Sequence, residues 1–415
     1  MTEDKVQAAL VEMARGTFPD LLDADVRVSF AESPTFAEFQ SALEDDPVLS
    51  AFAPPEQPFV NQSLGHGWLV QEGLLPVALA LSAARLHVAA GRSAQDDDAY
   101  VETLENVLRS FRAAIGGAVV EATVVIGIEG LTIAEGRVLE TPWGRLRAAS
   151  PLERRLRPSR LAPTAILTST TPVRLAIGAD SDDLASQGHD RGALADAVER
   201  VALLLPLAAL LAHTHRDEYV VPAVVWASSI APGEPASVYF GAHRGGGSHA
   251  ANESVPVRDG GQPLSGDEEK ALVEWCALVG ERYDDALEIA VSRAMRALIE
   301  RYDESDALID ALVAAESLFG AGGSAEGGLR VASALALLLE PEVARRRAYR
   351  AALVRVHRTR NAVVHGGEVD GRELSEDKEA ALRAVVLALR ALFSDHPALI
   401  AHRDRGERLI LGDIA

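Results

Sequence analysis

The sequence predicts an α+β protein, with a mixed α/β N-terminal domain in residues 1–260 and an all-helical C-terminal domain in residues 261–415. Segments rich in valine and isoleucine, which favour strands, occur only in the first part of the chain. A glycine-rich stretch with few apolar residues, 244–266, follows them and has the composition of a linker. Beyond it, the apolar residues keep helical spacing. A chain of 415 residues is also too long for one ordinary core, so two domains are expected.

The first domain is predicted to alternate between helices and strands. Helical spacing of apolar residues appears early, and prolines break the chain between the helical pieces. The β-rich segments begin after Gly116-Gly117, and Thr141-Pro142-Trp143-Gly144 has the composition of a hairpin turn. The expected helices are 35–43, 98–114 and 192–213, and the expected strands are 118–128, 137–147 as a hairpin, 165–177, 220–229 and 236–242.

The second domain is predicted to be a series of helices. Ser265 is followed three residues later by Glu268, which is the pattern of a helix N-terminal capping box. Pro341 suits a first helical turn, and Gly366-Gly367 suits a helix end. The expected helices are 265–277, 281–301, 304–319, 327–339, 341–365 and 375–394.

Composition narrows the classes of protein to consider. The single cysteine, Cys276, excludes an internal disulfide framework and a four-cysteine zinc site, and it fits a reducing cytoplasm. The first residues lack the apolar run of a signal peptide, and the most apolar stretch contains Pro206 and is too short to span a bilayer. The net charge of −21 disfavours passive adhesion to nucleic acid or to anionic membranes. We therefore expect a cytoplasmic protein without a membrane partner.

One segment runs against this acidity. Residues 343–367 contain no acid and seven arginines, at positions 345, 346, 347, 350, 355, 358 and 360. On a helix, Arg350, His357, Asn361 and His365 share one stripe with Arg360 at its edge. Arginine binds phosphate through two parallel hydrogen bonds, and histidine exchanges a proton near neutral pH. A solvated arginine-rich face with a capping histidine has the same pattern, so chemistry alone leaves both interpretations open.

The end of this segment, Arg360-Asn361-Ala362-Val363-Val364-His365-Gly366, resembles the motif of the HEPN superfamily. The preceding sequence is similar to the Apea-like branch of that family: Asp306-Ala-Leu-Ile-Asp310 runs into Ala315-Glu316-Ser-Leu-Phe319, and a glycine-rich turn follows. The resemblance covers about residues 275–395. Ala315 departs from the leucine usual in that branch, which affects packing more than chemistry. Residues 1–260 carry no such resemblance, and we expect them to sense a trigger or select a substrate.

The resemblance implies a helical bundle that dimerises through the C-terminal domain and cleaves RNA without metal or cofactor. It implies that His365 activates the ribose 2′-hydroxyl or assists the leaving oxygen, that Arg360 holds the scissile phosphate, and that Asn361 orients one of them. Further contacts to RNA phosphates are expected from Arg346, Arg350, His357 and Arg358. Such enzymes act as toxins of toxin–antitoxin pairs or as antiphage defence effectors, so an antitoxin or a defence protein is an expected partner.

Two alternatives stay open at this point. Many HEPN domains are non-catalytic modules that bind RNA, a nucleotide or a partner protein, and the same motif would serve them. A metallohydrolase centred on His213 and His215 is a weaker hypothesis, because these histidines fall at the end of an apolar helix, where histidines commonly cap. The sequence favours the nuclease.

Overall fold

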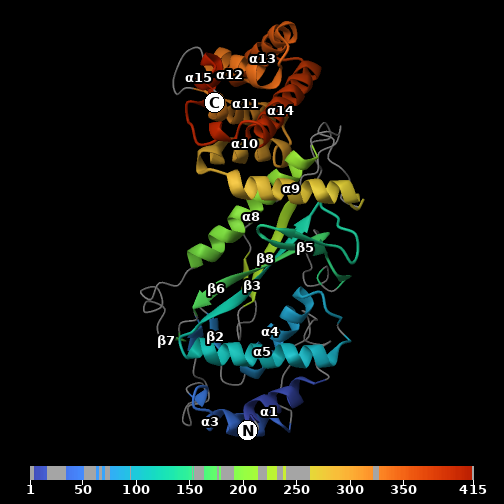
Figure 1. Ribbon diagram of the computed structural model, residues 1–415, viewed down its shortest axis with the longest axis vertical. Helices are drawn as coiled ribbons and strands as arrows, with labels where there is room; N and C mark the ends of the chain where they lie inside the picture. Colours follow the sequence, from blue (N-terminus) through green and yellow to red (C-terminus); the bar gives the residue numbers. More distant parts are fainter. Residues whose placement is uncertain are drawn as a thin grey trace. The chain divides into compact units, whose positions relative to one another are not determined.

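A computed structural model describes residues 4–15, 34–50, 62–64, 68–70, 75–93, 95–151, 153, 163–174, 177–178, 191–213, 222–230, 237–239, 262–320 and 327–413. The chain forms two compact units. The first comprises Met1–Ile128, Gly144–Glu199 and Val224–Gly241, and the second comprises Glu129–Trp143, Arg200–Ala223 and Ala242–Ala415. The predicted α+β class is confirmed (Figure 1). The predicted boundary at 260 follows chain order, whereas the second unit also takes in two earlier segments.

The helices of the first unit form an apolar core. α5 illustrates why they form: Asp96 caps its N-terminus by accepting a 3.1 Å hydrogen bond from the amide of Ala99, and the apolar residues from Tyr100 to Ala114 line one buried face. Arg112 of α5 then binds Asp4, before α1, and Asp46, after α3. Within the described part of this unit, the helices that form the core are α1 (Lys5–Ala14), α3 (Phe36–Glu44), α4 (Leu75–Ala89) and α5 (Asp97–Ile115).

Strands of the first unit lie side by side in the order β5, β6, β3, β8, β9. β3 pairs with β6 in antiparallel register from Val119 opposite Arg174 to Ile128 opposite Ala165, and β3 is buried on both faces from Val124 onwards. These strands are β3 (Val119–Glu129), β5 (Gly144–Ala148), β6 (Ala165–Arg174), β8 (Ala223–Ile230) and β9 (Ser237–Tyr239). A small separate sheet has the order β2-β1-β7, from β1 (Gln62–Leu64), β2 (Trp68–Val70) and β7 (Ile177–Gly178).

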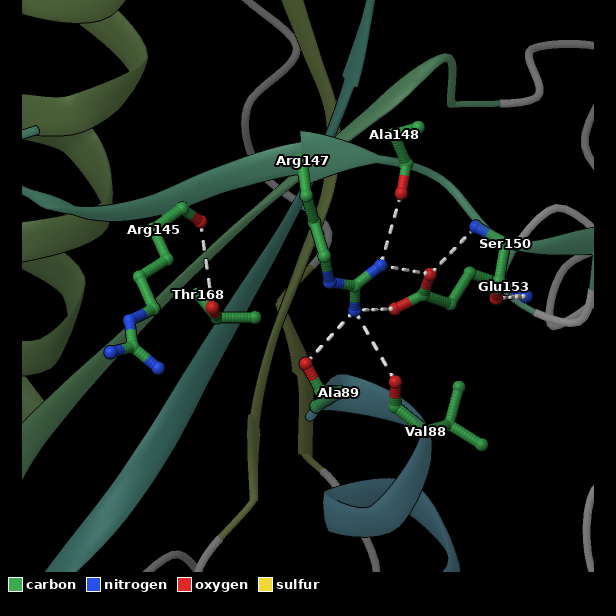
Figure 2. A network of polar contacts seen from close by, with 8 residues as sticks. All are labelled: Val88, Ala89, Arg145, Arg147, Ala148, Ser150, Glu153 and Thr168. Carbon is green, nitrogen blue, oxygen red and sulfur yellow. Dashed lines mark hydrogen bonds and ion pairs between the residues drawn. The ribbon is translucent and has the colours of Figure 1, made fainter. Parts of the chain in front are cut away.

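A buried ion pair connects β5 to α4 in this unit. The guanidinium of Arg147 donates to both carboxylate oxygens of Glu153, at 2.6 and 2.7 Å, and to the carbonyl oxygens of Val88 and Ala89 at the end of α4 (Figure 2). Glu153 also accepts a 2.9 Å hydrogen bond from the amide of Ser150. Arg147 therefore adds hydrogen bonds to carbonyl oxygens at the end of α4, and Glu153 neutralises its charge.

In the described ranges 262–320 and 327–413, α-helices of the second unit follow one another from residue 266. Each predicted C-terminal helix is present, and α15 with two short 3₁₀ turns adds elements that the sequence did not indicate. The predicted capping box is confirmed: Ser265 and Glu268 bond to each other's backbone amides. The helices are α9 (Gly266–Arg282), α10 (Glu288–Ile299), α11 (Glu304–Phe319), α12 (Gly327–Leu339), α13 (Val343–Val364), α14 (Gly371–Ser394) and α15 (Arg405–Leu411).

α11 is the central helix of the bundle and packs against α10, α12, α13, α14 and α15. Its buried Asp310 accepts 2.6 Å hydrogen bonds from Arg293 of α10 and from Arg301, so the charge of this carboxylate is compensated from two sides. The apolar positions of α11 are mainly alanine and leucine, which allows close approach of its neighbours.

Two segments from earlier in the chain complete the second unit. β4 (Val138–Thr141) packs beside α9, and Arg137 donates a 2.9 Å hydrogen bond to Glu269. α8 (Arg191–Ala212) ends in this unit, where Arg390 of α14 donates to the carbonyl oxygen of Leu211. Among the helices that the structure describes, none has the length and hydropathy needed to cross a membrane.

Candidate functional site

The arginine-rich segment forms α13, and one side of this helix is anchored to the bundle. Leu353 and Val356 are buried on this side. Asp377 of α14 is fully buried and accepts a 2.6 Å hydrogen bond from the hydroxyl of Thr359 and a 3.1 Å hydrogen bond from Arg355. Arg355 therefore has a structural partner, and its charge is compensated by the protein itself.

The C-terminus of α13 presents His365 to solvent. His365 is the C-cap residue and is exposed, and its amide donates a 3.0 Å hydrogen bond to the carbonyl oxygen of Asn361. Gly366 follows with φ +73°, and the amides of Gly366 and Gly367 reach back to the helix at 3.1 and 2.7 Å. This pair of bonds is a Schellman motif, which requires a left-handed residue directly after the cap. The glycines thus end the helix at the histidine and leave its imidazole accessible.

Arg360 lies on a different side of α13 from His365. Five residues of helix separate the two side chains by roughly 140° around the axis. The guanidinium of Arg360 is three-quarters buried, with 25% of the side chain exposed; it donates a 3.2 Å hydrogen bond to Asn361 Oδ1 and lies 3.7 Å from the carboxylate of Glu316 on α11. The side chains of Arg360 and Asn361 are therefore in direct contact, as the orienting role expected of Asn361 requires.

His357 faces the interior of the bundle. Only 8% of this residue is exposed, and its Nδ1 lies 4.0 Å from Glu316. Its Nε2 is buried and has no hydrogen-bond partner in the part of the chain that the structure describes. Burial first, and the charge of Arg360 second, lower the pKa of His357 to about 4. The ring is consequently neutral near pH 7 and is not exposed for contact with a phosphate.

Gly328, at the start of α12, allows the neighbouring helix to approach this histidine. A Cβ on Gly328 would lie 3.0 Å from Nδ1 of His357, closer than side chains normally pack. A Cβ on the adjacent Gly327 would meet nothing within 4 Å. The close contact therefore favours glycine at position 328, whereas the packing leaves room for a side chain at position 327.

The remaining predicted phosphate-binding arginines differ in how they are held. Arg346 donates 2.8 Å hydrogen bonds to the carbonyl oxygens of Glu340 and Pro341, and so closes the turn between α12 and α13. Arg350 is exposed and donates a 2.8 Å hydrogen bond to Ser333 of α12. Arg358 is exposed, and within the described part of the chain it shows neither a hydrogen bond nor an ion pair. Arg347 is likewise exposed, and the sequence analysis did not name it as a phosphate-binding residue.

The structure thus places the predicted residues in two groups. Arg350, Arg358, Asn361 and His365 are exposed along α13, whereas Arg360 and His357 lie on its inner side near Glu316. Glu316 was noted in the sequence only as part of the family resemblance. Its place beside Arg360 depends on how α11 packs against α13, which no local pattern indicates.

The weaker metal hypothesis concerns His213 and His215. His213 is buried at the end of α8, and His215 lies outside the described residues. Within the described ranges, no group of three or more histidine, cysteine, aspartate or glutamate side chains is arranged to hold a metal ion.

Neither family models, nor curated proteins, nor solved structures gave a match to this chain.

Proposed function

We propose that the C-terminal unit is a metal-independent endoribonuclease of HEPN type. The observation that supports this proposal best is the end of α13, where an exposed histidine follows a guanidinium–amide pair on a helix segment with seven arginines and no acid. This segment gives an otherwise acidic protein a local attraction for a polyanion, which a net charge of −21 would otherwise repel.

The proposed reaction is attack by a ribose 2′-hydroxyl on the adjacent phosphate. The O2′–P bond forms, the P–O5′ bond breaks, and the products are a cyclic phosphate and a free 5′-hydroxyl. His365 takes the proton of the 2′-hydroxyl or gives one to the leaving O5′. Arg360, oriented by Asn361, holds the non-bridging oxygens and stabilises the charge that develops on them. Arg350 and Arg358 bind neighbouring phosphates, and the buried His357 has no contact with RNA in this scheme.

The separation of Arg360 and His365 around α13 favours a site composed of two chains. A two-fold contact would bring His365 of one copy near Arg360 of the other, so each of the two sites would draw on both copies. The contact must flank the arginines, because bringing two such segments together is repulsive. We therefore propose a homodimer through the C-terminal unit.

The nuclease is tested with purified full-length protein, single-stranded RNA and excess chelator. We expect cleavage that leaves cyclic-phosphate ends, and we expect His365→Ala to lower the rate by about 100-fold or more. His402→Ala, at a partly exposed histidine of the same unit, is the control and should retain activity. Cleavage that needs a divalent metal, or equal rates for the two variants, would contradict the proposal. Growth arrest on expression of the wild type, but not of His365→Ala, would further support a toxin or a defence effector.

The composite site is tested by mixing Arg360→Ala with His365→Ala chains. If each site takes one residue from each copy, the mixed dimer regains one intact site, and a random mixture should recover roughly a quarter of the wild-type rate. No recovery, in a mixture shown to exchange subunits, would place both residues in a site within one chain.

A second candidate function is a non-catalytic RNA-binding module. The ion pair of Arg360 with Glu316 favours it, because the guanidinium is already engaged by a carboxylate of the protein. Tight RNA binding by the wild type without any cleavage, in the assay above, would support this alternative over the nuclease.

A further inference from the structure

Glu316 on α11 faces Arg360 and His357, which both lie on α13. Its carboxylate is 3.7 Å from a terminal nitrogen of Arg360 and 4.0 Å from Nδ1 of His357. Both separations are longer than a hydrogen bond. The three side chains therefore form a polar cluster in which the carboxylate is near its partners without being bonded to them.

Two atoms of this cluster are buried and have no hydrogen-bond partner among the described residues: Nε of Arg360 and Nε2 of His357. Buried donors and acceptors are normally satisfied, and groups that are not often mark functional sites. Because burial keeps His357 neutral, it offers no counter-charge to the carboxylate. Arg360 is thus the cation that faces Glu316 in this cluster, and it still has capacity to bind a further acceptor.

We propose that Glu316 is an internal competitor for the phosphate site: its carboxylate occupies Arg360 in the free protein, and a phosphate of the RNA must displace it. The inference rests on the proposed function, because it concerns the same arginine. A guanidinium binds a carboxylate and a phosphate through the same N–H groups, so the two anions compete for one face. Their charges also repel each other at contact distance.

The geometry allows this displacement. The Glu316 side chain is 36% exposed, so rotation towards solvent does not bury its charge. The ion pair is loose, at 3.7 Å, and partly open to solvent, so its contribution to folding stability is small. The need to displace Glu316 therefore lowers the affinity for RNA by a modest factor. A polyanion that makes several contacts along α13 can still displace the carboxylate.

The test measures binding of a fluorescent 2′-O-methyl oligoribonucleotide, which binds but lacks the nucleophile for cleavage. We expect the full-length Glu316→Gln variant to bind about two- to five-fold more tightly than the wild type, as expected for the loss of one exposed ion pair. Glu376→Gln is the matched control, because it also removes a single negative charge from the unit, at a residue that pairs with Arg372 on α14. Its affinity should stay close to that of the wild type.

A second comparison places both carboxylate variants in an Arg360→Ala background. The gain from Glu316→Gln should disappear there, because no guanidinium is released. A gain that persists without Arg360, an equal gain from Glu376→Gln, weaker binding by Glu316→Gln, or no binding by any chain would overturn the proposal. Circular dichroism of each variant identifies a loss of fold, in which case Glu316→Ala replaces Glu316→Gln.

The same experiment separates this inference from the nuclease proposal. Cleavage of unmodified RNA by the wild type tests the nuclease alone. If the Arg360-dependent gain in affinity occurs and no chain cleaves RNA, the competition by Glu316 stands and the protein is a binding module. If the wild type cleaves RNA and Glu316→Gln brings no gain, the nuclease stands and Glu316 is not a competitor.

Discussion

Thr359 donates a 2.6 Å hydrogen bond to the carboxylate of Asp377, and this bond ties the arginine-rich α13 to α14 from inside the bundle. Arg355 adds a second bond to the same carboxylate at 3.1 Å, from a side chain that is more than half exposed. The exposed side of α13 is thus held in place by contacts on its inner side. Changes at Asp377 should affect the position of the helix without touching RNA.

We predict that Asp377→Ala destabilises the bundle by about 1.5–3 kcal/mol, the range for a hydrogen bond to a charged group. The bond from Arg355 accounts for only a small part of this free energy, because its guanidinium stays solvated. Native-state hydrogen exchange of α13 and α14 measures the loss. Glu376→Ala, at the exposed neighbouring residue, should change stability by less than about 0.5 kcal/mol. Equal effects of the two substitutions would show that the buried bond is not important.

Gly327 and Gly328 give a second matched pair. Gly328→Ala should destabilise the contact between α12 and α13 by about 1–3 kcal/mol, because the new Cβ lies 3.0 Å from the buried ring of His357. Gly327→Ala meets nothing within 4 Å and should be neutral or stabilising by up to about 1 kcal/mol, since alanine loses less backbone entropy. Hydrogen exchange of α12 distinguishes the two, and a stabilising Gly328→Ala would contradict the packing described.

The buried His357 predicts how stability depends on pH. Its folded-state pKa of about 4 lies below the ordinary value of 6.5, so the unfolded chain binds the proton first as pH falls. The contribution of the neutral His357 to folding stability is therefore complete above about pH 6.5, and it is lost progressively as pH falls towards 4. Between pH 7 and 5 we expect a loss of about 2 kcal/mol from this residue.

The measurement compares thermal unfolding of the wild type and of His357→Gln at pH 7 and pH 5. Carboxylates titrate alike in both proteins, so the difference between them isolates the histidine. The wild type should lose more stability than the variant on acidification. Equal losses would show that the ring is exposed enough to take up a proton in the folded state.

The Arg147–Glu153 pair in the first unit predicts an asymmetric response. Glu153→Ala should destabilise the contact between β5 and α4 by about 3 kcal/mol or more, because it leaves a guanidinium buried without its counter-ion. The double variant Arg147→Met with Glu153→Leu should be destabilised less than Glu153→Ala, since it removes both charges. Arg145→Ala, at an exposed neighbour whose side chain points away from the network in Figure 2, is the control. Hydrogen exchange of β5 and α4 measures each, and a double variant less stable than Glu153→Ala would contradict this account.

The sequence by itself determined the secondary structure and the candidate motif. Helix and strand positions could be predicted because periodicity, caps and glycine punctuation act over a few residues: Ser265 with Glu268 begins α9, and Gly366 ends α13 directly after His365. The spacing of Arg350, Arg358 and His365 on one side of the helix also follows from the sequence, and all three are exposed.

Only the tertiary structure decided which residues of α13 turn inward and what they meet there. His357 shares the predicted stripe with His365, yet it is buried because α12 approaches through Gly328. Glu316 lies beside Arg360 because α11 packs on α13, and residues 129–143 and 200–223 belong to the same compact unit as the C-terminal helices. These contacts join residues that are far apart in the chain. Their energy comes from burial and ion pairing between elements, so the local spacing of residues does not predict them.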